Sequence, residues 1–171
     1  MLQLWPFTIN MSGKYFAGAS RSNGTSSPKR ILVVDDEPLI RRLYTEALAD
    51  VGYEVDAAED GAVAWDALQA NAYDLLITDY IMPKVSGIDL LKNINAARMT
   101  LPVMMATATF PEQVFILYPE LQPEITLLKP HDMTDFLEAV EEILYTNNGV
   151  REESVPPPVC QIRPAANRLR L

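Results

Sequence analysis

The stretch Leu75-Leu76-Ile77-Thr78-Asp79-Tyr80-Ile81-Met82-Pro83 decides the fold of this chain. Its first part, residues 75–77, is a short apolar run of the kind that forms a strand buried on both faces of a parallel sheet. The run stops at a carboxylate, Asp79, and a loop that contains Pro83 follows. Because ligands bind at the carboxyl ends of the strands in an open parallel sheet, Asp79 is predicted to lie where chemistry is done. A strand-end aspartate considered alone is more often a loop cap.

Apolar runs and helical patterns alternate along the chain. The strands are predicted at 31–34, 53–57, 75–78, 102–106 and 125–128, and the helices at 38–51, 61–70, 88–97, 110–118 and 132–145. The pattern at 110–118 is the weakest, because Pro111 and Pro119 lie at its ends. This alternation predicts an α/β fold, a doubly wound parallel sheet of five strands with helices on both faces.

Length and composition suit one globular domain with some chain to spare, since 49% of the 171 residues are hydrophobic. No apolar run approaches the roughly 20 residues that cross a bilayer, so no membrane contact is expected. The single cysteine, Cys160, allows no internal disulfide, and a reduced, cytoplasmic setting is expected. Residues 29–146 hold 8 Lys and Arg against 21 Asp and Glu, a net charge of −13 that disfavours direct binding of nucleic acid.

The two ends of the chain differ in composition from its middle. Residues 1–28 are rich in Ser, Gly and Asn and are predicted to be a disordered leader, although four aromatic residues lie within them; Met11 is an alternative start. Residues 147–171 include three consecutive prolines and are predicted to be a disordered tail. The folded domain is therefore predicted to span residues 29–146.

Four of the five predicted strands end in a functional group. Those groups are Asp35 and Asp36, Asp79, Thr107 and Lys129. Three carboxylates at one edge of a sheet repel one another unless a cation joins them, and hard oxygen ligands suit Mg²⁺. A backbone carbonyl just after Asp79, assigned to Ile81, could complete the oxygen set.

Together these groups form a site for phosphoryl transfer onto a carboxylate. Asp79 is the predicted nucleophile because it lies on the central strand, facing the acidic pair and Lys129. The lysine would neutralise an arriving anion, and the hydroxyl of Thr107 would hydrogen-bond it. Each group also has an ordinary interpretation when taken alone. Asp35 and Asp36 could cap a helix, Thr107 could be a loop hydroxyl, and Lys129 could be a surface charge.

The set resembles the receiver domain of two-component response regulators over about residues 30–145. The matching motifs are Ile31-Leu-Val-Val-Asp35-Asp36-Glu37-Pro38, Asp79 with Met82-Pro83 and Gly87, Pro102-Val-Met-Met-Ala-Thr107-Ala108, and Leu127-Leu128-Lys129-Pro130. The resemblance implies a flavodoxin-like strand order, 2-1-3-4-5. It also implies that a phosphohistidine donor phosphorylates Asp79, that Asp36 ligates Mg²⁺ directly and Asp35 through water, and that the Lys129-Pro130 bond is cis.

Two positions depart from that family's pattern. The family commonly has Tyr or Phe three residues before the lysine, where this chain has Thr126, so the aromatic half of the activation switch is missing. The residue two after the nucleophile is often polar or Met in the family, and here it is Ile81. Neither departure touches the predicted phosphorylation, but both bear on the output and lifetime of the signal.

The resemblance implies a signalling switch without enzymatic activity beyond its own phosphorylation and dephosphorylation. Its expected partners are a sensor histidine kinase or a histidine phosphotransfer protein, and an unknown downstream protein that contacts the fourth and fifth helices and the fifth strand. Only about 25 residues follow residue 145, too few for an output domain.

Two alternatives stay open. A magnesium-dependent phosphohydrolase of the haloacid dehalogenase type carries Asp-x-Asp on its first strand, whereas Asp35 and Asp36 are adjacent here and the predicted nucleophile is on the third strand. A degenerate receiver that binds partners without being phosphorylated is disfavoured because every predicted site position is filled, although Thr126 keeps this alternative open.

Overall fold

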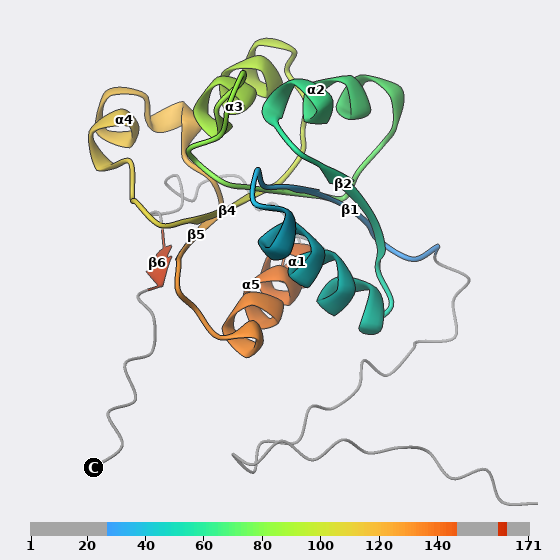
Figure 1. Ribbon diagram of the computed structural model, residues 1–171. Helices are drawn as coiled ribbons and strands as arrows, with labels where there is room; N and C mark the ends of the chain where they lie inside the picture. Colours follow the sequence, from blue (N-terminus) through green and yellow to red (C-terminus); the bar gives the residue numbers. More distant parts are fainter. Residues whose placement is uncertain (1–26, 147–160, 164–171) are drawn as a thin grey trace, which may run out of the picture.

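One parallel sheet runs through the middle of the computed structural model, which describes residues 27–146 and 161–163 (Figure 1). Within these residues the strands lie in the order β2-β1-β3-β4-β5-β6, and each strand is parallel to its neighbours. Their bounds are β1 Arg30–Val34, β2 Glu54–Ala58, β3 Leu75–Thr78, β4 Val103–Thr107, β5 Ile125–Leu128 and β6 Gln161–Arg163. The predicted order 2-1-3-4-5 is confirmed for the first five strands.

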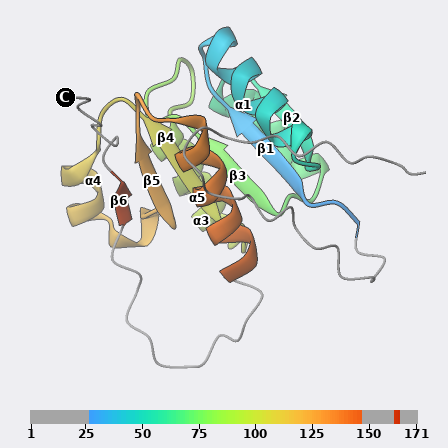
Figure 2. The same cartoon turned by 90° about the horizontal axis from the view of Figure 1, so that it is seen from below.

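Helices cover both faces of the sheet, as predicted. Their bounds are α1 Pro38–Asp50, α2 Gly61–Ala70, α3 Gly87–Ala96, α4 Glu112–Leu117 and α5 Met133–Thr146, with a short 3₁₀ helix, η1, at Pro119–Leu121. Helices α1 and α5 pack on one face, and α2, α3 and α4 pack on the other (Figures 1 and 2). In the described residues no helix combines the length and apolar character needed to span a membrane.

The core consists of two apolar layers that share the central strands. Successive side chains of a strand point to opposite faces, so Ile31 and Ile77 join the layer under α1 and α5. Leu32 and Leu76 join the layer under α2 and α3. Burial on both faces holds β1, β3 and β4 in place, and it brings the carboxyl ends of these strands to one edge.

Two helices differ from the prediction. Helix α4 has six residues rather than the nine predicted, because Pro111 occupies its N-cap without a side-chain cap and Pro119 begins η1. On α1 the apolar residues Leu39 and Leu43 are 74% and 49% exposed. The buried face of α1 instead carries Tyr44 and Leu48.

The prediction of a tail without structure over 147–171 is corrected at residues 161–163, where β6 pairs with β5. The remainder of that tail, and residues 1–26 of the predicted leader, lie outside the described residues. β6 lies on the side of β5 away from β4 and extends the sheet by one strand. Its sequence, Gln161-Ile162-Arg163, contains a single apolar residue, so the pattern predicts no strand there.

Candidate functional site

Three carboxylates meet where β1 and β3 end. The register pairs Val34 with Thr78, so the next residues, Asp35 and Asp79, emerge side by side. One carboxylate oxygen from each of Asp35, Asp36 and Asp79 lies within 4.8 Å of the others. Asp35 is buried, Asp79 is half-buried and Asp36 is exposed. The predicted clustering of these carboxylates therefore occurs, at the predicted edge of the sheet.

Lys129 joins this cluster from the end of β5. Its Nζ atom lies 2.6 Å from Asp35 Oδ2 and 3.1 Å from Asp79 Oδ2. Burial raises the pKa of Asp35, with a smaller contribution from the charge of Asp79, although the Lys129 ammonium opposes the rise. Burial alone would lower the pKa of Lys129, but its hydrogen bond and attraction to Asp35, and the charge of Asp79, leave that pKa raised. The lysine is therefore held charged inside the cluster.

Asp35 and Asp36 do not cap α1. The N-cap of this helix is Glu37, and no side chain caps it. Asp35 Oδ1 accepts a hydrogen bond from the Glu37 backbone N–H at 2.9 Å, which closes a tight turn after β1. Arg41 Nη1 donates to the Asp35 carbonyl at 2.7 Å. The interpretation of the acidic pair as simple helix caps is therefore wrong.

Thr107 ends β4 beside the cluster, but its hydroxyl is used locally. The residue is buried, and its Oγ1 atom lies 3.3 Å from both the backbone N–H and the carbonyl oxygen of Thr109. Its own carbonyl accepts a hydrogen bond from the Lys129 backbone N–H at 2.8 Å. Thr107 therefore contacts Lys129 of the site through its backbone carbonyl, whereas its hydroxyl is hydrogen-bonded to the following loop.

The loop after Asp79 is anchored at two points. Gly87 N–H donates to the Tyr80 carbonyl, and a Cβ atom at Gly87 would lie only 2.0 Å from the Asp79 carbonyl oxygen. Asp60, which caps α2, accepts a hydrogen bond from Lys84 Nζ at 2.5 Å. The sequence analysis missed this second anchor. Asp60 before Gly61 is a helix-start signal, but nothing local connects it with Lys84.

The two positions that depart from the family pattern are in different environments. The Ile81 side chain follows Asp79 in this loop and is 63% exposed. Thr126 is fully buried in the middle of β5. The cis bond expected between Lys129 and Pro130 is present.

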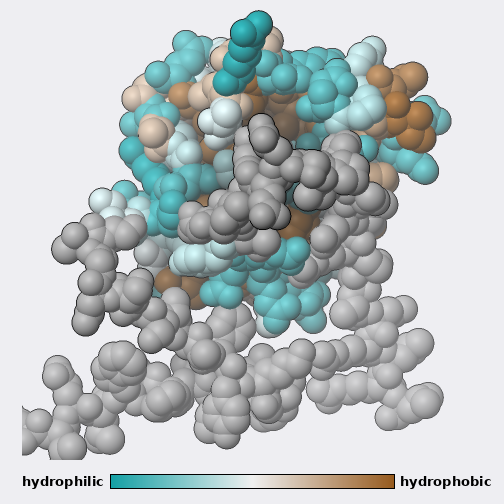
Figure 3. Space-filling model, turned by 180° about the vertical axis from the view of Figure 1, so that it is seen from behind, coloured by the Kyte–Doolittle hydropathy of each residue, from teal (hydrophilic) through white to brown (hydrophobic). Residues whose placement is uncertain are grey.

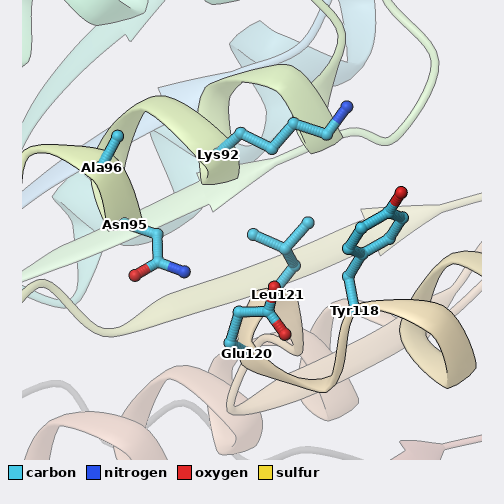
Figure 4. Close-up of a pocket in the computed structure, with 6 residues that line it drawn as sticks. All are labelled: Lys92, Asn95, Ala96, Tyr118, Glu120 and Leu121. Carbon is cyan, nitrogen blue, oxygen red and sulfur yellow. The ribbon is translucent and has the colours of Figure 1, made fainter.

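A wide hollow on the surface lies away from the acidic cluster. It measures about 420 Å³ and is lined by side chains of α3, η1 and the turn before η1 (Figure 4). Its charged residues, Lys92 and Glu120, stand on separate elements, and Lys92 pairs with Asp89. None of the predicted site residues lines this hollow.

The response regulator receiver domain matches residues 31–141 of this chain. The chemotaxis protein CheY of Pseudomonas aeruginosa is 34% identical over 123 residues, which cover 70% of this chain and 99% of that protein. The sensor histidine kinase RcsC of Salmonella typhimurium is 42% identical over 78 residues, or 46% of this chain. This chain spans only 8% of the length of RcsC and 22% of that of the transcriptional regulator NtrC of Rhizobium meliloti.

Solved structures share the fold. The chemotaxis response regulator CheY4 of Vibrio cholerae has a TM-score of 0.63 and 27% identity, over 69% of this chain and 100% of that chain. The response regulator TrrA of Thermotoga maritima, in complex with Mg²⁺-BeF, has a TM-score of 0.61 and 34% identity, over 68% of this chain and 99% of that chain.

These similarities leave the phosphohydrolase alternative without support. They agree with the strand order of the sheet. This chain belongs to the receiver domains of two-component response regulators, whose members act as phosphorylation-dependent signalling switches.

Proposed function

We propose that this receiver takes a phosphoryl group onto Asp79, with Lys129 and Thr107 contacting the transferred group. The observation that carries the proposal is the position of the Lys129 Nζ atom, which contacts both Asp35 and Asp79 within the carboxylate cluster. A cation is already held beside the acceptor, where the oxygens of an incoming phosphoryl group would lie. Such preorganised charge is the main way in which proteins stabilise phosphoryl transfer.

We propose that Mg²⁺ binds to Asp35, Asp36, Asp79 and the backbone carbonyl of Ile81. Carboxylate and carbonyl oxygens are the ligands that Mg²⁺ prefers. Three carboxylates stand against one ammonium, and their oxygens lie close enough together to share one ion. When bound, the ion neutralises charge on the phosphoryl oxygens. The exposed carboxylate of Asp36 leaves the cluster open to solvent.

The transfer itself moves one phosphoryl group between two proteins. A carboxylate oxygen of Asp79 forms a bond to the phosphorus of a phosphohistidine, and the bond between phosphorus and the imidazole nitrogen breaks. The electron pair of the broken bond stays on that nitrogen, which takes up a proton from solvent. The donor is proposed to be a sensor histidine kinase or a histidine phosphotransfer protein, in line with the similarity to CheY and to a histidine kinase.

Phosphorylation is proposed to change the structure around the site through the hydroxyl of Thr107. Its hydroxyl would turn from Thr109 towards the phosphoryl oxygens, and the loop that leads to α4 would move with it. Helix α4 exposes Ile116 and Leu117, and Figure 3 shows hydrophobic residues at the side of the molecule where α4 lies. A downstream protein is proposed to contact the surface formed by α4, β5 and α5. In this region β6 pairs with the edge of β5 that faces away from β4.

The test is intact-mass measurement of the full chain after incubation with acetyl phosphate and Mg²⁺. One phosphoryl group is expected on the wild-type chain, and none on Asp79→Asn or in the presence of a chelator. Asp74→Asn is the matched control. Asp79 follows β3 and Asp74 precedes it, so Asp74 lies at the opposite edge of the sheet, where it pairs with Lys29. Labelling that persists in Asp79→Asn would place the acceptor elsewhere. A wild-type chain that takes no label would instead favour the unphosphorylated binding module.

A further inference from the structure

Three aromatic rings stack between α1, α5 and the turn that joins β5 to α5. Tyr44 of α1 lies 4.2 Å from Phe136 of α5, measured between ring centroids, with the ring planes 8° apart. His131 of the turn stacks on both, at 5.7 Å from Tyr44 and 6.0 Å from Phe136. Tyr44 and Phe136 are buried, and His131 is half-buried. Stacking alone would be served equally well by phenylalanine at all three positions.

Directional hydrogen bonds distinguish this stack from ordinary packing. The Tyr44 hydroxyl oxygen lies 2.9 Å from His131 Nε2, and His131 Nδ1 lies 3.3 Å from the Leu128 carbonyl oxygen. A carbonyl can only accept, so Nδ1 carries the proton and donates to it. Nε2 then has a free lone pair and accepts the hydrogen bond from the Tyr44 hydroxyl. A neutral imidazole in one tautomer therefore connects α1 with the last residue of β5.

The surrounding charges keep both groups neutral. Burial lowers the pKa of His131, and the neighbouring Lys129 ammonium lowers it further, although the Leu128 carbonyl and the carboxylates of Asp132 and Asp135 oppose the change. Burial raises the pKa of Tyr44, and the charges of Asp35 and Asp79 add to the rise. The Tyr44 hydroxyl thus stays a donor and His131 an acceptor at neutral pH. The effect of both carboxylates on Tyr44 also means that this hydroxyl is within electrostatic reach of the site.

Lys129 lies between Leu128 and His131, the two residues that this hydrogen bond joins. Leu128 precedes it and accepts from His131, which follows two residues later. The flexible lysine stem can bridge Asp35 and Asp79 only if its backbone is held at the right place relative to β1 and β3. We propose that Tyr44 and His131 are a positioning pair, which ties the turn after β5 to α1 and so fixes the Lys129 ammonium between the two carboxylates. As far as the rate of phosphoryl transfer is concerned, this inference rests on the proposed function.

Removal of single hydroxyl groups tests the pair. Tyr44→Phe keeps the ring and removes the donor, while Tyr73→Phe is the matched control, since the Tyr73 hydroxyl donates to Asp56 at 2.7 Å away from the site. With acetyl phosphate and Mg²⁺ at pH 7.5, Tyr44→Phe should be labelled about three- to tenfold more slowly, the range that one buried hydrogen bond corresponds to. Tyr73→Phe should keep the wild-type rate.

A double-variant cycle then tests whether the two residues act together. His131→Phe should slow labelling, and Tyr44→Phe combined with His131→Phe should be no slower than the slower single variant. His131→Gln offers an acceptor that does not titrate, and it should recover part of the rate. A wild-type rate in Tyr44→Phe, or a double variant that shows the product of the two single effects, would overturn the pairing.

A measurement without phosphorylation separates this inference from the proposed function. NMR relaxation of the full chain labelled with ¹³C-lysine reports how rigidly the Lys129 side chain is held, and ¹⁵N-histidine shifts give the tautomer of His131. We expect the proton on Nδ1, and a more mobile Lys129 side chain in Tyr44→Phe than in the wild type or Tyr73→Phe. If the wild-type chain takes no label, the proposed function fails, and these measurements still decide the positioning role. An unchanged mobility of the Lys129 side chain in Tyr44→Phe, or a proton on Nε2, would refute that role.

The pH profile supplies a signature that a packing role would not give. Below its ordinary pKa of 6.5, His131 begins to lose the stabilisation that its neutral form provides, because protonation turns Nε2 from an acceptor into a donor and so reverses the hydrogen bond with the Tyr44 hydroxyl. The ratio of the wild-type rate to the Tyr44→Phe rate should therefore change as the pH drops through the pKa of His131. Taking a ratio removes the titration of groups common to both chains. A ratio that stays constant while NMR shows His131 titrating would contradict the proposal.

Discussion

The two halves of the site differ in how they are held before any ligand arrives. At the ends of β1, β3 and β5, side chains from distant parts of the chain bond to one another, as Lys129 does to Asp35 and Asp79. At the end of β4, both hydrogen bonds of the Thr107 hydroxyl within the described part of the chain are to the backbone of Thr109, two residues away. The first half is cross-linked between strands, and the second half is satisfied within its own loop.

This difference follows from the cost of burying each kind of group. A carboxylate or an ammonium removed from water is strongly unfavourable unless an opposite charge or hydrogen bonds replace the lost water, so the charged half must assemble when the chain folds. A hydroxyl can be satisfied by a nearby backbone group and exchange that partner at little cost. A switch needs one part that stays in place and one part with two arrangements. The charged half suits the first role and Thr107 suits the second.

Lys129→Met should have the largest effect, and it tests most directly whether the charged half of the site is assembled before the phosphoryl group arrives. Without the ammonium, Asp35 and Asp79 face each other unpaired, and we expect phosphoryl labelling to fall by about 100-fold or more. Intact-mass time courses measure this rate, with Lys92→Met on α3 as the control for loss of an exposed lysine. If Lys129→Met were labelled nearly as fast as the wild type, the preassembled charge would have no role in transfer.

Gly87→Ala should damage the fixed half through the backbone. The new Cβ would lie 2.0 Å from the Asp79 carbonyl oxygen, so the loop or the carbonyl must move. We expect the free energy of unfolding to fall by about 1–3 kcal/mol, as for an overpacked site, together with slower labelling. Urea denaturation gives the first quantity and intact mass the second. Gly61→Ala, which would crowd Val85 instead, should destabilise the fold with less effect on labelling.

Thr107→Ala should have a smaller effect than either variant, because the hydroxyl is hydrogen-bonded within its own loop. We expect the free energy of unfolding to fall by about 1 kcal/mol. The labelling rate should fall much less than it does in Lys129→Met. Thr107→Ser should restore both values. A loss in Thr107→Ala as large as that in Lys129→Met would mean that the threonine belongs to the preassembled half, and would remove the distinction drawn above.

Ile81→Asn addresses the lifetime of the phosphoryl group and should give the smallest change. Hydrolysis needs a water in line with the bond to Asp79, and an exposed isoleucine side chain offers it no hydrogen bond. An asparagine should orient such a water and speed the first-order decay, by less than the roughly 100-fold that dedicated positioning groups contribute in enzymes. Thr109 carries a hydroxyl that can partly compensate. Equal or slower decay in Ile81→Asn, under the same Mg²⁺ concentration, would show that the lack of a polar side chain at position 81 does not prolong the lifetime of the phosphoryl group.

The sequence by itself determined the sheet and the edge at which the site lies. Apolar runs such as 31–34 and 75–78 are typical of strands buried on both faces, and the helical patterns between them favour parallel crossovers. Asp35, Asp79 and Lys129 follow three of these strands directly. Once the strands are parallel and in register, these residues must meet. Periodicity and position along the chain therefore carried the prediction of the fold and of the charged half of the site.

The tertiary structure alone decided which groups hold the others in place. Asp60 with Lys84, and Tyr44 with His131, are joined across 24 and 87 positions of the chain, and no local pattern connects the members of either pair. The pairing of β6 with β5 likewise joins segments that are far apart in the chain, residues 125–127 and 161–163. The physical reason is the range of the interactions. Strand and helix patterns depend on near neighbours and on which face is apolar, whereas these contacts exist only after the closed fold brings distant segments together.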